Sequence, residues 1–297
     1  MAAEDEMDNR SKGDSTIGHV SDTALWVAMY RAMENDRPNP LFKDPLAARL
    51  AGERGQQIAE SMPGGKLVEW ALVVRTVAID CLISKAIHDG ADCVVNLGAG
   101  LDSRPYRMRL PSSLRWIEVD FPGIIAMKSE LLRDETPVCR LERMAVDLTD
   151  REASRALFKS IGAQAQNILV ITEGVIYYLS NQEAANLSDD LLAVRSVRHW
   201  IHDYRNGMSF LPKKWAKAFK DAPFKFNAPD WVGFFCERGW AIEQRVYADD
   251  EARRISRPMP FIFPWSPLIS LACAISSVAR ARMREMSGFV MFKRAVS

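Results

Sequence analysis

Residues 94–107 read VVNLGAGLDSRPYR, in which an apolar run rich in valine leads into two glycines. Such a run predicts a buried strand, and glycines at its end let a ligand approach the backbone because they carry no Cβ atom. A helix that begins after this turn would add unpaired N–H groups. The stretch therefore predicts a ligand site at Gly98, Ala99 and Gly100, although glycines also form plain strand-to-helix turns.

The residues that follow alternate short apolar runs with helical stretches. Strands are predicted at residues 114–120, 144–148, 166–172 and 198–204, and two late strands at 240–247 and 287–295. Strands that alternate with helices indicate a parallel sheet covered on both faces. No obvious crossover helix precedes Ser287, so the last strand is expected to be antiparallel. We therefore predict an α/β fold with a mostly parallel seven-stranded sheet.

A single domain is predicted for residues 21–297, after a polar and flexible tail at 1–20. The domain is divided into a helical cap at 21–90, a core sheet at 91–250 and 284–297, and a lid insert at 251–283. In the cap, Asp44 is the candidate cap residue of the second helix, with Pro45 in the first turn of that helix.

The composition limits the classes of protein to which the chain can belong. Its 297 residues include 39 Lys and Arg against 38 Asp and Glu, and 48% of them are apolar. These values are typical of a globular protein. Without a basic excess, a protein held to nucleic acid by phosphate contacts is not expected. The five cysteines lie far apart and form no CxxC pair, which predicts reduced thiols in the cytoplasm and no metal site.

One apolar stretch resembles a membrane span. Residues 259–279 contain no charged side chain and are long enough to cross a bilayer, but three prolines interrupt them. A buried helix and a loop over an apolar pocket explain this stretch better. The amino-terminal residues also lack the apolar core of a secretory signal. We therefore predict no membrane span.

Acidic residues end three of the predicted strands that follow the glycine turn. Asp120 lies 22 residues after Gly98, where a carboxylate can bind both hydroxyls of a ribose. At the next strand end, Asp147 can accept a hydrogen bond from an adenine amino group while Leu148 packs against the ring. Glu173 ends the strand after that. Ligands of open α/β sheets bind beyond the carboxyl ends of the strands, so these acids are expected to share one crevice.

The charge of the crevice favours one of two possible nucleotide cofactors over the other. A dinucleotide needs the third glycine of GxGxxG beside its pyrophosphate, but Ser103 occupies that position and Asp102 adds negative charge. S-adenosylmethionine has a cationic sulfonium and no phosphate, so it suits an acidic crevice better. Its methionyl carboxylate still needs a cation, for which Arg75 in the apolar helix at 66–88 is the candidate. Arg75 could otherwise form a buried ion pair or reach the surface.

These motifs resemble the leucine carboxyl methyltransferase superfamily, and within it the bacterial branch that includes the tetracenomycin polyketide carboxyl O-methyltransferase. The similarity covers residues 22–180 and is most specific in GAGLDSR, EVDFP and EGVIYYL, in this order. It implies a class I methyltransferase with a Rossmann-like fold and S-adenosylmethionine as cofactor.

The resemblance also implies roles for single residues. Arg75 would hold the methionyl carboxylate, Gly98 would form the glycine-loop contact and Asp120 would bind the ribose. Asp147 and Leu148 would contact the adenine, and Glu173 would lie by the methionyl end. Where many relatives have a second basic residue in the motif ART-R, this chain has Val77. The resemblance therefore indicates the cofactor more firmly than the acceptor.

The acceptor decides whether the reaction needs a general base. A carboxylate with a pKa of about 4 is ionised at neutral pH and needs none, so catalysis would depend on positioning and on the exclusion of water. A phenol with a pKa of about 10 would need a base, for which His202 is the nearest candidate. Tyr178, His202 and Tyr204 are the candidates for contact with the acceptor, and no catalytic residue is assigned.

We therefore predict a cytoplasmic enzyme that esterifies a small-molecule carboxylic acid, polyketide-like or otherwise apolar. Methylation of a phenol or of a protein C-terminal carboxylate are alternatives within the same class. A non-catalytic cofactor-binding protein and a dehydrogenase are alternatives from other classes. No nucleic-acid partner is expected, and a homodimer is left open.

Overall fold

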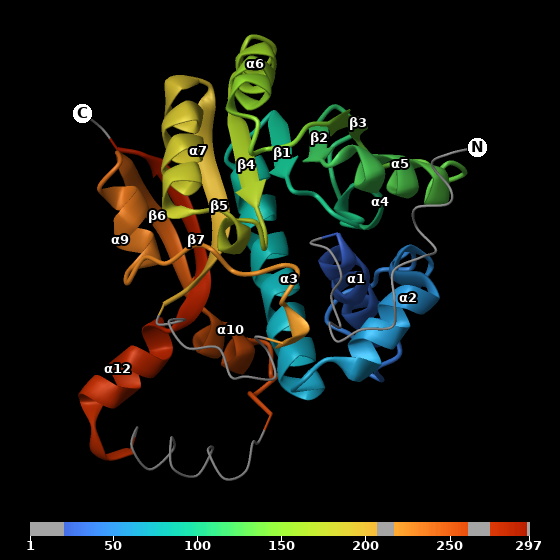
Figure 1. Cartoon of the computed structure of the whole chain (residues 1–297), viewed down its shortest axis with the longest axis vertical. Coiled ribbons are helices and arrows are strands. Elements are labelled where there is room, and N and C mark those ends of the chain that lie inside the picture. Colours follow the sequence, from blue (N-terminus) through green and yellow to red (C-terminus); the bar gives the residue numbers. More distant parts are fainter. Residues whose placement is uncertain (1–20, 207–216, 261–273, 296–297) are drawn as a thin grey trace.

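Seven strands form one sheet in the computed structural model, which describes residues 21–206, 217–260 and 274–295 (Figure 1). They are β1 (Cys93–Leu97), β2 (Arg115–Asp120), β3 (Arg140–Ala145), β4 (Ile168–Thr172), β5 (Val197–Arg205), β6 (Trp240–Tyr247) and β7 (Ser287–Arg294). Their order in the sheet is β3-β2-β1-β4-β5-β7-β6. Strands β1 to β5 are parallel, and β7 is antiparallel to both β5 and β6. The mostly parallel α/β sheet with an antiparallel last strand is therefore confirmed.

The third strand lies earlier in the chain than the sequence predicts. β3 ends at Ala145, whereas the prediction placed this strand at residues 144–148. It is an edge strand, and its side chains are half-buried or exposed, so RLERMA lacks the apolar pattern that marks an interior strand. Asp147 and Leu148 consequently follow the strand and do not end it.

The helices before the sheet are α1 (Asp22–Asn35), α2 (Ala47–Ser61) and α3 (Gly65–His88). The later ones are α4 (Arg104–Arg107), α5 (Pro122–Leu131), α6 (Arg151–Gly162), the 3-10 turn η1 (Ile176–Tyr178), α7 (Asn181–Ala193), α9 (Trp231–Cys236), α10 (Ala248–Arg254) and α12 (Ser277–Glu285). Helix α12 ends directly before β7, where the sequence shows no obvious helix.

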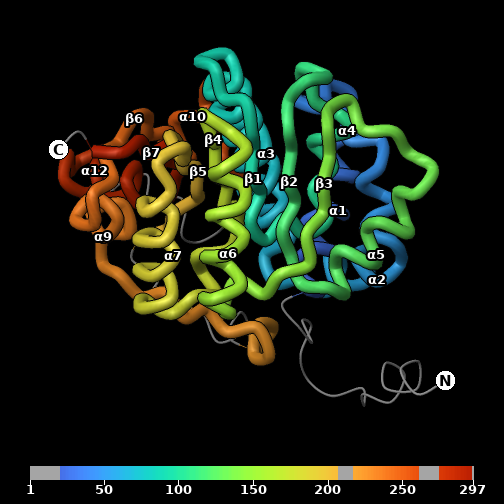
Figure 2. The backbone as a smooth tube through the Cα atoms, turned by 90° about the horizontal axis from the view of Figure 1, so that it is seen from above, coloured from blue at the N-terminus to red at the C-terminus, as the bar shows by residue number. Residues whose placement is uncertain are grey.

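Helices cover both faces of the sheet because successive residues of a strand point to opposite sides. Val95 and Val170 pack with α6, α7 and α9 on one face. Val94 and Leu169 pack with α3 and α10 on the other face. Figure 2 shows α6 and α7 on one side of the strands and α3 on the other. Both faces are therefore buried, as the continuous apolar strands require.

Helices α1 and α2 pack beside α3 at the end of the sheet where β1 finishes (Figure 1). Ala28 of α1 and Leu50 of α2 share an apolar cluster with Leu101, which follows the glycine turn. Because Leu101 belongs to the loop after β1, this cluster attaches the amino-terminal helices to the predicted ligand site.

The predicted lid insert at 251–283 lies only partly within the described residues. Its first part belongs to α10, which packs against α3 and β7, and its last part belongs to α12. The indole N–H of Trp70 in α3 donates a hydrogen bond of 2.7 Å to the carbonyl oxygen of Arg257. Residues 261–273 and the tail at 1–20 lie outside the described residues, so the lid and the tail stay predictions. Across the described residues, no helix has both the length and the apolar character to cross a bilayer.

Replacing Gly98 with alanine is expected to lower the free energy of unfolding by about 1–3 kcal/mol. Gly98 has a φ of 64°, and an added Cβ would lie 2.4 Å from Cγ2 of Val175. Urea unfolding measures the change. Gly123→Ala in α5 is the matched control, because an added Cβ there meets no atom within 4 Å. Equal stability of the two variants would contradict the expected strain at Gly98.

Candidate functional site

The carboxyl ends of β2, β4 and β5 bring acidic side chains to one edge of the sheet. Asp120 is the last residue of β2, and Glu173 follows β4 directly. Thr172 of β4 pairs with His202 of β5, which places Glu173 next to Asp203 along this edge. The predicted acidic edge therefore exists, and Asp203 is a further member of it.

The backbone N–H groups of the glycine loop already have partners within the fold. Those of Gly98 and Ala99 both donate to the carbonyl oxygen of Val119, at 2.8 and 3.1 Å. The N–H of Gly100 donates to Oδ2 of Asp120 at 2.6 Å. A pyrophosphate would have to break these bonds to be held by the loop. The structure therefore adds a reason against a dinucleotide that does not depend on charge.

The helix after the glycine loop is shorter than expected. α4 contains four residues, and the N–H of Arg104 at its start donates to Oδ1 of Asp102 at 2.9 Å. The prediction of unpaired N–H groups at this position is therefore wrong for Arg104, because the Asp102 side chain occupies its donor.

Asp120 retains hydrogen-bonding capacity toward a ligand. Its Oδ1 accepts from the N–H of Phe121 at 2.7 Å, and its Oδ2 accepts from Gly100. Burial raises the pKa of Asp120, and these two N–H groups oppose the rise. Each carboxylate oxygen can accept a second hydrogen bond. The side chain can therefore still bind hydroxyl groups.

Asp147 and Leu148 lie at the same edge, just beyond β3. Asp120 pairs with Ala145 in the register of β2 and β3, so Asp147 follows two residues after the partner of Asp120. Oδ1 of Asp147 accepts from the N–H and the hydroxyl of Thr149, at 2.8 and 2.7 Å. Leu148 packs against the core beneath α6 and α7. The two predicted adenine contacts are therefore neighbours, one exposed and one half-buried.

Arg75 lies within the acidic edge. Its Nε is 2.8 Å from Oε1 of Glu173, and its Nη1 is 3.4 Å from Oδ2 of Asp203. Asp203 also accepts a hydrogen bond of 2.8 Å from the N–H of Gly174, which holds the turn after β4. Of the structural alternatives that the sequence left open for Arg75, the buried ion pair is observed and the surface position is not.

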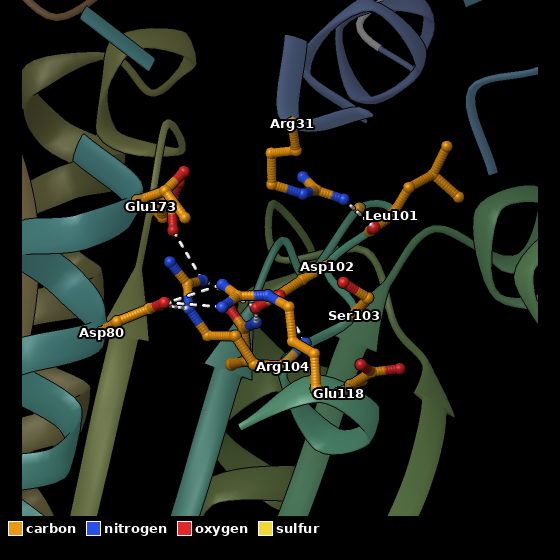
Figure 3. A network of polar contacts seen from close by, with 12 residues as sticks. Arg31, Asp80, Leu101, Asp102, Ser103, Arg104, Glu118 and Glu173 are labelled. Atoms are coloured by element: carbon orange, nitrogen blue, oxygen red, sulfur yellow. Dashed lines mark hydrogen bonds and ion pairs between the residues drawn. The ribbon is translucent and has the colours of Figure 1, made fainter. Parts of the chain in front are cut away.

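A second arginine, Arg104, which was not predicted from the sequence, contacts the other carboxylate oxygen of Glu173 (Figure 3). Nη1 of Arg104 is 2.8 Å from Oδ2 of Asp102 and 2.8 Å from Oε2 of Glu173. Its Nε is 2.6 Å from Oδ1 of Asp80 in α3. The motif GAGLDSR contains this arginine. Asp102 and Glu173, which the sequence already placed at this edge, were the signal that a cation must be buried beside them.

Another buried group ties α1 to the glycine loop. Arg31 donates to Oδ2 of Asp44 at 2.8 Å and to the carbonyl oxygen of Leu101 at 2.6 Å. The hydroxyl of Ser103 donates to the same Asp44 oxygen at 2.6 Å. Asp44 was predicted to cap a helix, but α2 begins at Ala47 without a side-chain cap. The structure uses Asp44 as a buried acceptor between the cap and the loop.

The arginines balance much of the negative charge at this edge. Burial alone would raise the pKa of Asp102 and of Glu173, but Arg104 and its neighbours lower both below their ordinary values. Both carboxylates are therefore ionised and compensated at neutral pH. The acids that the sequence shows at this edge fold against arginines, so acidity alone does not separate the two cofactors.

His202 and Tyr204 were predicted to contact the acceptor but lie in the core. The His202 side chain is fully buried among the rings of Trp200, Phe235 and Phe292. The Tyr204 hydroxyl accepts a hydrogen bond of 2.9 Å from Arg245. Both side chains point to the face opposite Asp203, because alternate residues of a strand face opposite sides. We therefore leave both out of the candidate site.

Tyr177 and Tyr178 follow Glu173 in η1 and remain close to the site. Burial raises the pKa of Tyr177 well above its ordinary value, and the Asp203 charge adds to the rise. Burial raises the pKa of Tyr178 to about 12. Tyr178, one of the predicted acceptor contacts, is therefore a neutral, half-buried side chain near the end of β4.

Two buried polar atoms at this edge lack a hydrogen-bond partner in the described part of the chain, Nε of Arg75 and Oε2 of Glu173. Each is within ion-pair distance of an opposite charge, but neither forms an aligned hydrogen bond. The methionyl end of S-adenosylmethionine carries a carboxylate and an ammonium group, which are charges opposite to those of Arg75 and Glu173. The residues therefore fit this cofactor. Among the residues described, no group of His, Cys, Asp and Glu is arranged to hold a metal ion.

Comparisons with known sequences show the family to which the chain belongs. The family model described as leucine carboxyl methyltransferase matches residues 24–192. A protein from Frankia alni, provisionally named an S-adenosyl-L-methionine-dependent methyltransferase, is 33% identical over 256 residues, which are 80% of this chain and 87% of the relative. A relative from Streptomyces avermitilis with the same provisional name is 36% identical over 257 residues, 80% of this chain and 89% of the relative.

Solved structures show the same fold at low sequence identity. A protein from Thermobifida fusca, provisionally identified as a methyltransferase, has a TM-score of 0.55 at 12% identity, covering 95% of this chain and 96% of that chain. A DUF574 family protein from Streptomyces avermitilis has a TM-score of 0.54 at 13% identity, covering 90% of this chain and 96% of that chain. At these identities the similarity concerns the fold alone.

Acidification is expected to destabilise the protein through His202. Burial lowers the pKa of His202 from 6.5 to about 4. The unfolded chain therefore binds the proton first, and the free energy of unfolding falls as the pH drops below 6.5, by roughly 2 kcal/mol at pH 5. The His202→Phe variant, which keeps an aromatic ring in place, should lose about 2 kcal/mol less between pH 7.5 and pH 5. Urea unfolding at several pH values measures both proteins, and parallel pH profiles would assign the effect to another group.

Proposed function

This chain belongs to the leucine carboxyl methyltransferase family and is an S-adenosyl-L-methionine-dependent methyltransferase, and we propose that its acceptor is the carboxylate of a small apolar acid. When bound, the cofactor supplies a methyl group on a cationic sulfur. Binding and orienting both molecules, and excluding water from them, are the tasks left to the residues of the chain.

In this proposal, different residues of the acidic edge bind different parts of the cofactor. Asp120 would bind the ribose hydroxyls with the lone pairs that its two N–H partners leave free. Arg75 would bind the methionyl carboxylate through its Nε, which forms no aligned hydrogen bond within the described residues. Glu173 would bind the ammonium group through Oε1, the oxygen that faces Arg75, while Arg104 stays beside Oε2. Asp147 and Leu148 would contact the adenine beyond β3.

A cation suited to the acceptor lies farther along the same edge. Arg205 is the last residue of β5 and shares the face of Asp203, because residues two apart in a strand point to the same side. Its side chain is exposed, and no carboxylate in the described part of the chain pairs with it. Burial raises the pKa of nearby Tyr177 well above its ordinary value, and the Arg205 charge opposes this rise. This exposed guanidinium near Tyr177, without a carboxylate partner among the residues described, is the observation that supports a carboxylate acceptor.

The side chains near this position also suit an acceptor that is already ionised. Burial keeps His202 neutral in the core, with a pKa of about 4. Burial also raises the pKa of Tyr177 and Tyr178, so both phenols stay protonated at neutral pH. Asp203 is occupied by Arg75 and by the N–H of Gly174. A carboxylate acceptor needs no base, and its reaction would depend on positioning and on excluding water.

Aromatic rings next to Tyr178 favour an apolar acid. The Tyr178 ring packs against Phe224 with a centroid distance of 5.4 Å, and Phe224 packs against Phe219 at 5.0 Å. Trp26 of α1 contacts Phe219 edge-on at 6.3 Å. Trp26 and Phe219 are buried in this cluster, whereas Tyr178 and Phe224 are half-buried and would be the rings that contact a flat apolar group. A polyketide-like acid is therefore our proposed class of substrate, and a cytoplasmic location and a homodimer stay predictions.

The proposal predicts where a labelled methyl group goes. The protein should transfer label from S-adenosylmethionine to apolar aromatic acids as a base-labile ester, and should leave the matching amides unlabelled. A panel that contains each acid, its amide and the corresponding phenol measures this, with scintillation counting before and after mild base. Label in the phenols, stable to base, would contradict the proposed acceptor and favour an ether product.

Arg205→Gln should raise the KM for an acid that the protein methylates by about tenfold or more, because the variant loses a charged partner of the acceptor carboxylate. The affinity for S-adenosylhomocysteine should stay unchanged. Arg205→Lys should raise the KM less than Arg205→Gln does, because lysine keeps the positive charge. Arg198→Gln is the matched control, since Arg198 is an exposed arginine near the opposite end of β5. An equal rise in KM for both glutamine variants would count against a specific role of Arg205.

A further inference from the structure

Glu173 lies between two arginines that come from different elements. Its Oε1 is 2.8 Å from Nε of Arg75 in α3, and its Oε2 is 2.8 Å from Nη1 of Arg104 in α4. Burial disfavours the ionised form, and the charge of Arg104, followed by that of Arg75, lowers the pKa of Glu173 below its ordinary value. Two cations therefore keep this buried carboxylate ionised.

The two arginines are held with different firmness. The Arg104 side chain is 3% exposed and contacts the three carboxylates of Asp80, Asp102 and Glu173 within 2.8 Å. The Arg75 side chain is 16% exposed, its contact with Asp203 is longer at 3.4 Å, and its Nε has no aligned hydrogen bond. Arg75 is thus the partner of Glu173 that a ligand can recruit, whereas Arg104 is fixed.

We propose that Arg104 is a positioning residue, which keeps Glu173 ionised and in place while the methionyl carboxylate of the cofactor binds Arg75. The inference rests on the proposed role of Arg75. If Arg75 turned to the ligand without Arg104 present, Glu173 would be a buried and uncompensated charge, which is strongly unfavourable. With Arg104 present, Glu173 keeps a partner and its second oxygen stays available to the ammonium group.

Arg107 provides a matched control for this role. It is also in α4, its side chain is 5% exposed, and its Nη1 lies 2.6 Å from Oδ2 of Asp80. It differs from Arg104 in having no ion pair with Glu173 within the described residues. The two arginines therefore share the same helix and the same partner in α3. Their other carboxylate contacts differ: Arg104 pairs with Asp102 and Glu173, and Arg107 lies 3.8 Å from Asp44.

Calorimetric titration with two nucleosides tests the proposal. S-adenosylhomocysteine carries a carboxylate and an ammonium group at the position of the methionyl end of the cofactor, and methylthioadenosine lacks both. Arg104→Lys keeps a charge but cannot bridge three carboxylates, so it should weaken S-adenosylhomocysteine binding by about tenfold or more and methylthioadenosine binding by less than about threefold. Arg107→Lys should change both affinities by less than about threefold. Thermal unfolding of each variant confirms that it is folded.

A double-mutant cycle with Glu173→Gln provides the second measurement. In that background no ionised Glu173 is left to stabilise, so adding Arg104→Lys should cost less than about threefold in S-adenosylhomocysteine affinity. This pair also avoids a stranded carboxylate at position 173 if Arg104→Lys alone does not fold. A cost that persists in the Glu173→Gln background, or an equal loss for both nucleosides, would overturn the proposal.

Arg75→Ala separates a failure of this inference from a failure of the proposed site. If Arg75→Ala weakens S-adenosylhomocysteine selectively and Arg104→Lys does not, the role of Arg75 stands and that of Arg104 falls. If Arg75→Ala affects both nucleosides equally, the proposed carboxylate site itself is wrong, and the inference falls with it. Neither result depends on the identity of the methyl acceptor.

Discussion

The buried ion pairs of Glu173 with Arg75 and Arg104 connect the three parts of the molecule from which the site is built. Arg75 comes from α3, Arg104 from the segment after β1, and Glu173 from the end of β4. Removing one partner of such a buried pair typically costs about 3–5 kcal/mol, because the other charge is left without compensation. The amino-terminal helices and the sheet must therefore be assembled before these charges are satisfied.

A second set of buried contacts connects the amino-terminal helices to the loop after β1. Arg31 reaches the carbonyl oxygen of Leu101, and Asp44 accepts from both Arg31 and Ser103. The loop that follows β1 is thus held from two sides, by α1 through Arg31 and by α3 through Asp80 and Arg104. A loop fixed in this way offers a cofactor a preorganised site, which reduces the entropy lost on binding.

The same arrangement explains how a methyltransferase of this kind can work without an assigned acid or base. The carboxylates Asp102, Glu173 and Asp203 form ion pairs with Arg75 or Arg104, and His202 of β5 is buried on the opposite face. In the proposed reaction, the exposed Arg205 would bind the carboxylate of the acceptor. Positioning two ligands against each other is a large enough effect to account for much of a rate enhancement.

The sheet and its order of elements were predictable because their signals are local. Apolar runs, the glycine turn after β1 and the acids at strand ends are all read over a few residues. The edge strand β3 was misplaced because a half-buried strand lacks the apolar run. His202 was misassigned because the sequence does not show which face of β5 packs against aromatic rings.

The sequence by itself determined the parallel sheet, the glycine loop and the carboxylates Asp120 and Glu173 at its edge, since each depends on neighbouring residues and on strand direction. Only the tertiary structure decided how those carboxylates are neutralised. Arg75 and Arg104 contact Glu173 from segments far from it in the chain. Asp44 does not cap α2 as predicted and instead accepts hydrogen bonds from Arg31 and Ser103. Ion pairs between distant segments depend on how helices pack against a sheet, because the cost of burying a charge is set by what the completed fold brings within a few ångströms of it.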